Sequence, residues 1–284
     1  MADVLISAED LHKRLTGADG PRPLVLDVRW ALGDPHGREH YLERRIPGSA
    51  YVDLNADLAA PAGALEGRHP LPEPAQFQAT ARRWGLHQGE SVVVLDDNGG
   101  LAAARAWWLL RWAGHAEVSL LDGGLAAWVE AGFELDGERD PIPSPEPGDV
   151  ELGSGGMPTL DIDEAAGFPG RGALLDARAG ERYRGETEPI DPRAGHIPGA
   201  LSAPTGENLR KDGKFKDAQE LRQRFEALGV PADGPVAAYC GSGVTAAHQV
   251  AALAVAGIDA ALYPGSWSQW SNHADRPVAT GPAA

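Results

Sequence analysis

An internal duplication is the feature that most limits the fold of this chain. Four pairs of similar segments occur in the same order in both halves, with the members of each pair about 150 residues apart. They are 24–29 with 173–178, 45–50 with 196–200, 92–95 with 236–239, and 120–128 with 262–270. Such a collinear match predicts two copies of one domain rather than a solenoid, whose repeats would be far shorter.

Each half alternates short apolar runs with segments of helical periodicity. Two of the expected helices, at 217–228 and 246–256, are each followed by a glycine in the position of a C-cap. This alternation is typical of a parallel sheet with helices on both faces. We therefore expect an α/β protein with two tandem domains, residues 1–140 and 158–284, joined by a linker at 141–157 that is rich in proline and glycine.

Composition excludes several classes of partner. The formal net charge of -16 disfavours nucleic acid and anionic membrane surfaces. The single cysteine excludes an internal disulfide and a zinc site of four thiolates, and we expect neither a metal nor an organic cofactor. The sequence has no uncharged run of about 18 apolar residues. These features predict a cytoplasmic protein.

Cys240 follows the apolar run at 236–239 and begins a glycine-rich loop that leads into a helix. A thiol in this position lies at the carboxyl end of a parallel strand, where ligands bind in such folds. Gly241 and Gly243 let the loop curl so that backbone N–H groups point inward, and Thr245 is a candidate cap for the helix. Because N–H donors and a helix N-terminus stabilise a thiolate, this setting favours a nucleophile over a buried structural cysteine.

Two kinds of cysteine chemistry do not fit this loop. A cysteine phosphatase needs an arginine at the sixth position after its cysteine to bind phosphate, and this chain has Ala246 there. A cysteine hydrolase needs a histidine base, but His248 is expected on the surface of the helix, directed away from the thiol.

Three motifs point to one known family: His-Ile-Pro-Gly-Ala at 196–200, the two Asp-x-Arg strand ends, and the loop at 240–245. Through them the chain resembles the two-domain rhodanese-like sulfurtransferases over essentially its whole length. This family includes thiosulfate and 3-mercaptopyruvate sulfurtransferases, and the Gly-Ser-Gly run after Cys240 is similar to the mercaptopyruvate branch. The resemblance implies two rhodanese-like domains, the first of them inactive because Asp96 and Asp97 stand where the cysteine would be.

The resemblance also implies a reaction. Cys240 would take a sulfane sulfur from 3-mercaptopyruvate or thiosulfate as a persulfide and pass it to cyanide, a thiol or thioredoxin. No cofactor is needed, because the ring of N–H groups can stabilise both the thiolate and the persulfide. Within the loop, Ser242 would contact the donor or relay a proton. Gly241, Gly243, Val244 and Thr245 would line the donor site.

The small anionic donor calls for cations near the loop. Arg182 matches a substrate-binding arginine of the mercaptopyruvate branch. The second arginine of that branch is replaced by Ile190, and the nearest guanidinium is that of Arg193, which leaves thiosulfate open as the preferred donor. The segment 68–72 resembles the loop that brings a histidine to the site, which makes His69 a candidate for proton transfer or donor contact.

A noncatalytic function is the alternative. The same loop could serve a thiol-based binding module that senses oxidants or docks a partner. The intact loop and the arginines near it favour the enzyme, whereas degenerate loops in both halves would favour the module.

Overall fold

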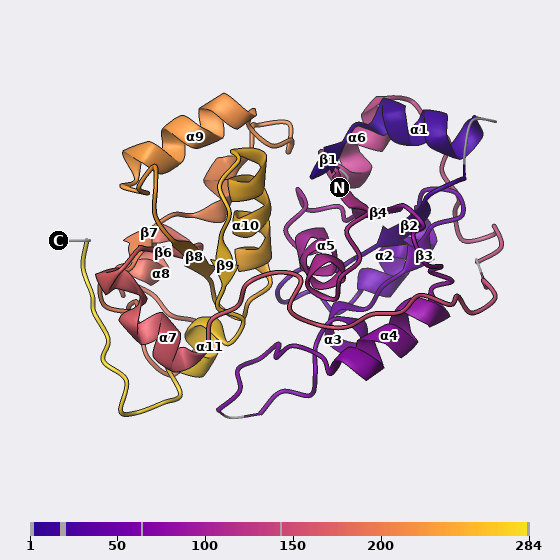
Figure 1. The fold of residues 1–284 in the computed structure, drawn as a ribbon. Helices are drawn as coiled ribbons and strands as arrows, with labels where there is room; N and C mark the ends of the chain where they lie inside the picture. The colour runs from indigo at the N-terminus through magenta and orange to yellow at the C-terminus, as the bar shows by residue number, and fades with distance from the viewer. Residues whose placement is uncertain (1–2, 18–20, 64, 143, 283–284) are drawn as a thin grey trace. The chain divides into compact units, whose positions relative to one another are not determined.

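The computed structural model describes residues 3–17, 21–63, 65–142 and 144–282, and the chain divides into two compact units (Figure 1). The first comprises Met1–Leu58, Pro72–Met157 and Lys211–Phe215. The second comprises Ala59–Leu71, Pro158–Arg210 and Lys216–Ala284. The duplication alone places 59–71 in the first domain and 211–215 in the second, so each unit contains a short segment from the other half of the chain.

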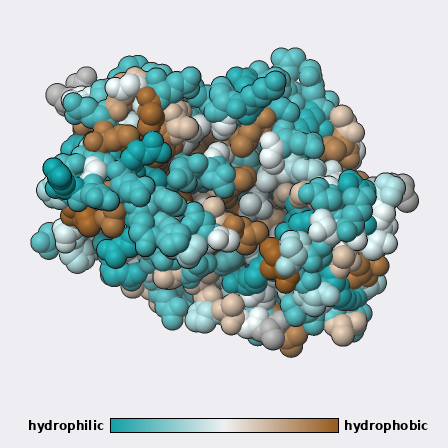
Figure 2. All heavy atoms as spheres, turned by 180° about the vertical axis from the view of Figure 1, so that it is seen from behind, coloured by the Kyte–Doolittle hydropathy of each residue, from teal (hydrophilic) through white to brown (hydrophobic). Residues whose placement is uncertain are grey.

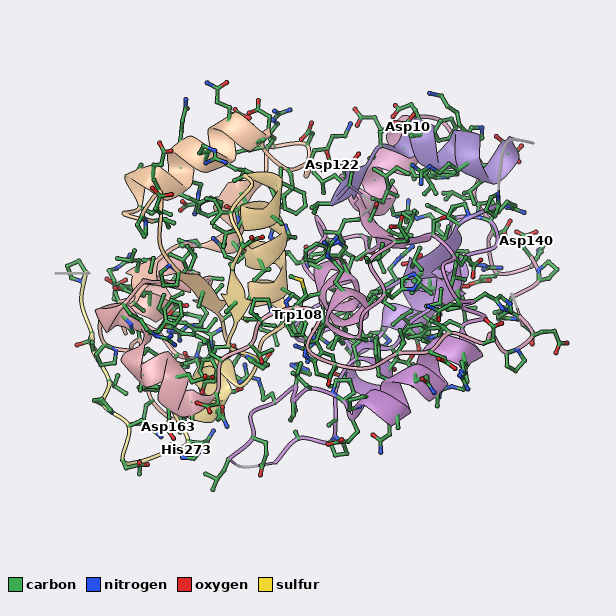
Figure 3. The ribbon with its side chains drawn as sticks, in the orientation of Figure 1. Asp10, Trp108, Asp122, Asp140, Asp163 and His273 are labelled. Atoms are coloured by element: carbon green, nitrogen blue, oxygen red, sulfur yellow. The ribbon has the colours of Figure 1, made fainter. Side chains whose placement is uncertain are left out.

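Hydrogen bonds explain this exchange of segments. The Phe215 N–H donates to Oδ1 of Asp122, one of the residues labelled in Figure 3, at 2.9 Å. In the second unit, the Arg68 N–H donates to Oγ of Ser268 at 3.1 Å, and the Gln269 side-chain amide donates to the Leu65 carbonyl at 3.0 Å. The segment 59–71 therefore belongs to the unit that contains Cys240.

The first unit has a parallel five-stranded sheet in the order β1-β5-β4-β2-β3. The strands are β1 (Leu5–Ile6), β2 (Leu24–Asp27), β3 (Ala50–Tyr51), β4 (Val92–Leu95) and β5 (Val118–Leu121). The helices are α1 (Ala8–Thr16), α2 (Gly37–Glu43), α3 (Leu54–Asp57), α4 (Pro74–Arg83), α5 (Ala103–Trp112) and α6 (Gly124–Glu130). Helix α5 connects β4 to β5 and is almost wholly buried, because both of its faces are apolar.

The second unit has a parallel four-stranded sheet in the order β7-β6-β8-β9. The strands are β6 (Ala173–Asp176), β7 (Leu201–Ser202), β8 (Val236–Tyr239) and β9 (Ala261–Leu262). The helices are α7 (Ile162–Gly167), α8 (Gly180–Tyr183), α9 (Ala218–Ala227), α10 (Thr245–Val255) and α11 (Ser266–Trp270), with 3₁₀ turns η1 (Phe168–Gly170) and η2 (Thr205–Asn208). Strands β6 to β9 follow the order of β2 to β5, which confirms the expected fold of two parallel α/β sheets.

The repeated motifs hold equivalent backbone positions in the two units. Each Asp-x-Arg arginine pairs with the aspartate before it and donates to the carbonyl of the residue that precedes the Arg/His-Ile-Pro-Gly segment. A tyrosine donates to the carbonyl of the residue after the glycine of that segment. The bonds to the carbonyls are Arg29 to Arg44 at 2.7 Å, Arg178 to Gly195 at 2.7 Å, Tyr41 to Ser49 at 2.6 Å and Tyr183 to Ala200 at 2.7 Å. The residues that the two halves have in common at these motifs therefore have a structural role, as expected for buried ion pairs in a scaffold.

Most of the large apolar side chains are buried in the two cores, which contain Trp128 in the first unit and Trp267 and Trp270 in the second. On the face drawn in Figure 2, apolar residues occur in small groups among hydrophilic ones. No helix among the described residues is long and apolar enough to cross a membrane.

Candidate active site

Cys240 directly follows β8 and is 1% exposed. Strand β8 lies between β6 and β9, and the chain passes from β6 to β7 on one side before it returns to β8 on the other. The carboxyl ends of β6 and β8 therefore form a topological switch point, which is where open α/β sheets bind ligands. The structure places the thiol at this edge, as the sequence predicts.

The loop after β8 is fixed by backbone hydrogen bonds on both sides of the sulfur. The Gly243 N–H donates to Sγ of Cys240 at 3.2 Å, and the Cys240 N–H donates to Oγ of Ser266 at 3.1 Å. The Trp267 N–H donates to the Cys240 carbonyl at 2.9 Å, and the Ser268 N–H to the Gly241 carbonyl at 2.8 Å. The start of α11 thus holds the loop in place while an N–H group faces the sulfur, an arrangement that stabilises a thiolate.

Gly243 is required both by its conformation and by its packing. Its φ is +80°, and a Cβ at this position would lie 2.5 Å from the Pro264 carbonyl oxygen. The sequence suggested only that the loop glycines allow it to curl. The structure shows that a side chain would also push the loop away from β9.

Substitution of Gly243 by alanine should therefore cost about 2–4 kcal/mol of stability, because left-handed strain adds to the clash with Pro264. Gly229→Ala is the matched control: its φ is +87°, but its nearest neighbour would be Leu201 Cδ1 at 3.9 Å. We expect the control to cost about 1 kcal/mol. Urea unfolding would measure both, and equal losses in the two variants would contradict the packing argument.

The expected capping role of Thr245 is wrong. Thr245 is the first residue of α10, and the N-cap position is held by Val244, which makes no side-chain cap hydrogen bond. Val244 has helical φ and ψ, so the backbone enters α10 without the extended turn that a capping hydroxyl needs. Val244 and Thr245 end the loop at 240–245, but their side chains do not orient the helix N-terminus through a cap.

His69 and Ser242 face each other. Nδ1 of His69 lies 2.8 Å from Oγ of Ser242, although the two residues are 173 positions apart. Ser242 is 7% exposed, so this contact lies largely out of water. Two residues that the sequence suggested separately thus form one hydrogen-bonded pair next to Cys240.

Arg182, at the end of α8, belongs to a cluster of charges beside the loop. Its Nη2 lies 2.6 Å from Oε1 of Glu188 and 3.3 Å from Oδ2 of Asp191. A Cβ placed on Gly241 would lie 3.6 Å from Nη1 of Arg182, so the guanidinium adjoins the residue after the cysteine. Burial raises the pKa of the Asp191 carboxyl, and the neighbouring arginines only partly offset this effect.

The guanidinium of Arg193, in contrast, binds backbone carbonyls after α11 and is not part of the charge cluster beside the loop. Its N–H groups donate to four backbone carbonyls, those of Trp270, Ser271, His273 and Arg276, at 2.7 to 2.8 Å. A guanidinium has five N–H donors, so these four hydrogen bonds use all but one of them to hold the segment after α11. The structure thus gives Arg193 a structural role and leaves it out of the group around Cys240.

Arg68 is the residue that the sequence argument missed. Its Nη1 forms an ion pair with Oδ1 of Asp191, and a Cβ on Gly241 would lie 3.0 Å from its Nη2. The signal was present in the sequence, because Arg68 directly precedes His69 in the segment already singled out. A single basic residue in an irregular segment gives no direction for its side chain, so only the structure places it.

His248 also differs from expectation. It is fully buried in α10, and its Nδ1 lies 2.8 Å from Oγ1 of Thr205 in η2. The residue was expected on the helix surface, but α10 is buried along most of its length because it is apolar on all sides. Its contact with Thr205 makes it part of the interior rather than a base for the thiol.

Asp96 occupies in the first unit the position that Cys240 has in the second. It directly follows β4, and its carboxylate accepts four backbone N–H bonds, from Asn98, Gly100, Ala102 and Ala103, at 2.8 to 2.9 Å. Burial raises the pKa of the Asp96 carboxyl, while the four N–H donors act in the opposite direction. The loop between strand and helix thus forms a ring of N–H groups around an anion, with a carboxylate already inside it.

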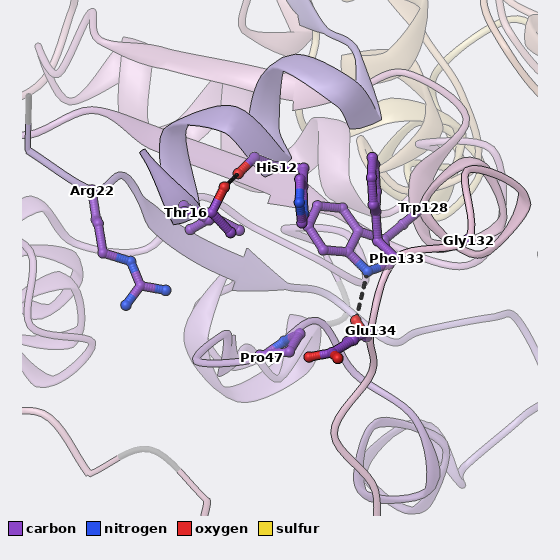
Figure 4. Close-up of a pocket in the computed structure, with 9 residues that line it drawn as sticks. His12, Thr16, Arg22, Pro47, Trp128, Gly132, Phe133 and Glu134 are labelled. Carbon is purple, nitrogen blue, oxygen red and sulfur yellow. Dashed lines mark hydrogen bonds between the residues drawn. The ribbon is translucent and has the colours of Figure 1, made fainter. Parts of the chain in front are cut away.

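Other features of the described residues do not compete with this site. A cavity of about 510 Å³ in the first unit is lined by His12, Trp128 and Phe133 among others (Figure 4). The rings of His12 and Phe133 stack at 4.0 Å, so their contacts are explained by packing. Within the described ranges, no group of three or more His, Cys, Asp or Glu side chains could hold a metal ion.

Comparisons with known proteins give one consistent family. The family model of the rhodanese-like domain matches residues 7–131 and 161–273. The chain is 50% identical over 290 residues to the "Probable 3-mercaptopyruvate sulfurtransferase" of Pseudomonas aeruginosa, covering 98% of both chains. It is 34% identical over 267 residues to the thiosulfate sulfurtransferase of Bos taurus, covering 91% of this chain and 88% of that protein. The crystal structure of the 3-mercaptopyruvate sulfotransferase SseA from Escherichia coli matches with a TM-score of 0.81 and 32% identity, over 94% of this chain and 99% of that chain.

Proposed function

Since the chain belongs to the two-domain rhodanese-like sulfurtransferases, we propose that Cys240 carries a sulfane sulfur from 3-mercaptopyruvate to a thiol or to cyanide. The observation that carries this proposal is the Gly243 N–H, which donates to the Cys240 sulfur at 3.2 Å at the carboxyl end of β8. A hydrogen-bond donor in that position stabilises both the thiolate that attacks and the persulfide that forms.

The first half of the reaction breaks the carbon–sulfur bond of the donor. The Cys240 thiolate attacks the donor sulfur, a new S–S bond forms, and the electron pair of the C–S bond leaves with carbon as the enolate of pyruvate. The enolate takes up a proton, which the donor thiol can supply, and the enzyme is left as a persulfide anion. With thiosulfate, the same attack would release sulfite.

The second half restores the enzyme. Cyanide attacks the outer sulfur of the persulfide and leaves as thiocyanate, while the S–S electron pair returns to Cys240 as the thiolate. A dithiol such as thioredoxin would accept the sulfur in the same way and then release it as sulfide with formation of its own disulfide. Ping-pong kinetics follow from the two separate halves. We place the enzyme in the cytoplasm, where such thiols remain reduced.

The pair formed by His69 and Ser242 provides a proton path next to the leaving enolate. The hydrogen bond of 2.8 Å between them is short enough to relay a proton, and both residues belong to the unit that contains Cys240. Ser242 follows the cysteine by two positions, so its hydroxyl is held by the same rigid loop. We assign the two side chains to proton transfer, and the N–H groups of the loop to the sulfur.

The donor assignment is tested by initial rates of thiocyanate formation with 3-mercaptopyruvate and with thiosulfate under the same conditions. We expect 3-mercaptopyruvate to be preferred by at least about tenfold in kcat/KM, because the loop after Cys240 has no cation of its own and donor binding falls to side chains suited to a carboxylate. A tenfold preference for thiosulfate would reverse the assignment. Absence of thiocyanate with both donors would leave the thiol-based binding module as the function.

A further inference from the structure

The first turn of α11 holds the loop that contains Cys240. The Trp267 N–H donates to the Cys240 carbonyl at 2.9 Å, and the Ser268 N–H donates to the Gly241 carbonyl at 2.8 Å. The hydroxyl of Ser266 accepts from the Cys240 N–H at 3.1 Å. The backbone is thus fixed on both sides of the thiol. Helix α11 has only five residues, so its own position depends on the groups that surround it.

The guanidinium of Arg193 binds the opposite end of the same helix. It donates to the carbonyls of Trp270 and Ser271, the last residue of α11 and its C-cap, both at 2.8 Å. It also donates to the carbonyls of His273 and Arg276, in the segment that follows, at 2.7 and 2.8 Å. The last carbonyls of a helix have no partner within the helix, and a cation there interacts favourably with the helix dipole.

The backbone of Arg193 holds α11 at a second point. Its carbonyl accepts from Nε1 of Trp267 at 2.9 Å, and the Trp267 side chain is fully buried. Cζ of Arg178 lies over the same ring, 4.6 Å from its centre, and Nη2 of Arg178 donates to the carbonyl of Gly195 at 2.7 Å. Arg193 is therefore fixed to the buried scaffold beside β6 while it binds both ends of α11.

We propose that Arg193 is a positioning residue for sulfur transfer, which fixes the loop of Cys240 through α11. The inference rests on the proposed function for its effect on turnover. Every step from the guanidinium to the loop is a hydrogen bond or the body of one short helix. Without the guanidinium, four carbonyls would turn to water and α11 could shift away from the loop. The Gly243 N–H, which donates to the sulfur, would then be misplaced.

The test compares Arg193→Gln with the wild type in two independent measurements. Hydrogen exchange at the amides of Trp267 and Ser268, followed by NMR, should rise by about 10- to 100-fold, because their bonds to the loop open more often. The single-turnover rate of persulfide formation from 3-mercaptopyruvate should fall by about tenfold. The donor concentration that gives half of the maximal rate should stay within about twofold, because the thiol is misplaced and the donor contacts are kept.

Arg193→Lys should recover part of both effects, since an ammonium also donates to carbonyls but lacks the planar fork that reaches four of them. Arg45→Gln is the matched control for a loss of stability. The guanidinium of Arg45 likewise donates to four backbone carbonyls, at 2.9 to 3.3 Å, but all of them belong to the first unit. Both glutamine variants should unfold at a lower urea concentration, and only Arg193→Gln should change the two amides and the persulfide rate.

Two outcomes would overturn the proposal. One is wild-type exchange or a wild-type persulfide rate in Arg193→Gln, and the other is an equal fall of that rate in Arg45→Gln. If the wild type forms no persulfide, the proposed function fails, and exchange at Trp267 and Ser268 still decides whether Arg193 positions the loop.

Discussion

Replacement of Cys240 by serine should lower thiocyanate formation by at least about four orders of magnitude with either donor. The hydroxyl of serine has nearly the same size as the thiol but is far less acidic, and it cannot form a persulfide. Because Cys240 is the only cysteine of the chain, no other thiol can take over the sulfur. Coupled initial-rate measurements with 3-mercaptopyruvate and thiosulfate would show the loss.

Intact mass spectrometry separates this chemical loss from a loss of folding. The wild type, after incubation with donor and without acceptor, should gain the mass of one sulfur, which a reductant removes. Cys240→Ser should gain nothing and should unfold within about 1 kcal/mol of the wild type, because the N–H bonds around position 240 can be made to oxygen as well. Turnover retained in the variant would contradict a persulfide mechanism through Cys240.

The sequence predicted best those features in which a reactive residue lies in a turn of characteristic composition. The run of apolar strand, cysteine and glycine-rich turn before a helix is typical of the carboxyl edge of a parallel sheet, and together with the alternation of strands and helices it predicted both the position of Cys240 and the fold. The duplication added the counterpart loop, with Asp96 directly after β4. Periodicity and turn chemistry suffice for these features because they act over a few neighbouring residues.

The side chains around the thiol were harder to predict because their contacts span the chain. His69 and Ser242 are 173 positions apart, and Arg68 and Asp191 are 123 apart. Arg193 was chosen for its nearness in sequence to the expected site, yet its guanidinium turns to the carbonyls after α11. The direction of a long flexible side chain depends on which acceptors the fold brings near it, and local pattern does not contain that information.

The second prediction with a large expected effect concerns the stability of the first unit and its buried carboxylate, Asp96. Asp96→Ala should lower the free energy of unfolding of that unit by about 3–5 kcal/mol, because four N–H groups, three of them in buried contacts, lose the charged acceptor that they share. Two of these groups, those of Ala102 and Ala103, belong to the start of α5, which is almost wholly buried and packs against β4 and β5. Urea unfolding followed by tryptophan fluorescence would measure the loss. Hydrogen exchange at the four amides should rise before exchange elsewhere in the sheet.

Asp97→Ala is the matched control, one residue further along the same loop. Its carboxylate is 39% exposed and lies 3.3 Å from Nη1 of Arg29, so its removal should cost no more than about 1 kcal/mol. If Asp96→Ala were as stable as this control, the four N–H bonds would not hold the loop. The expected difference would show that a carboxylate of the protein itself fills the ring of N–H groups after β4. At the equivalent position after β8, the Gly243 N–H donates to the sulfur of Cys240 instead.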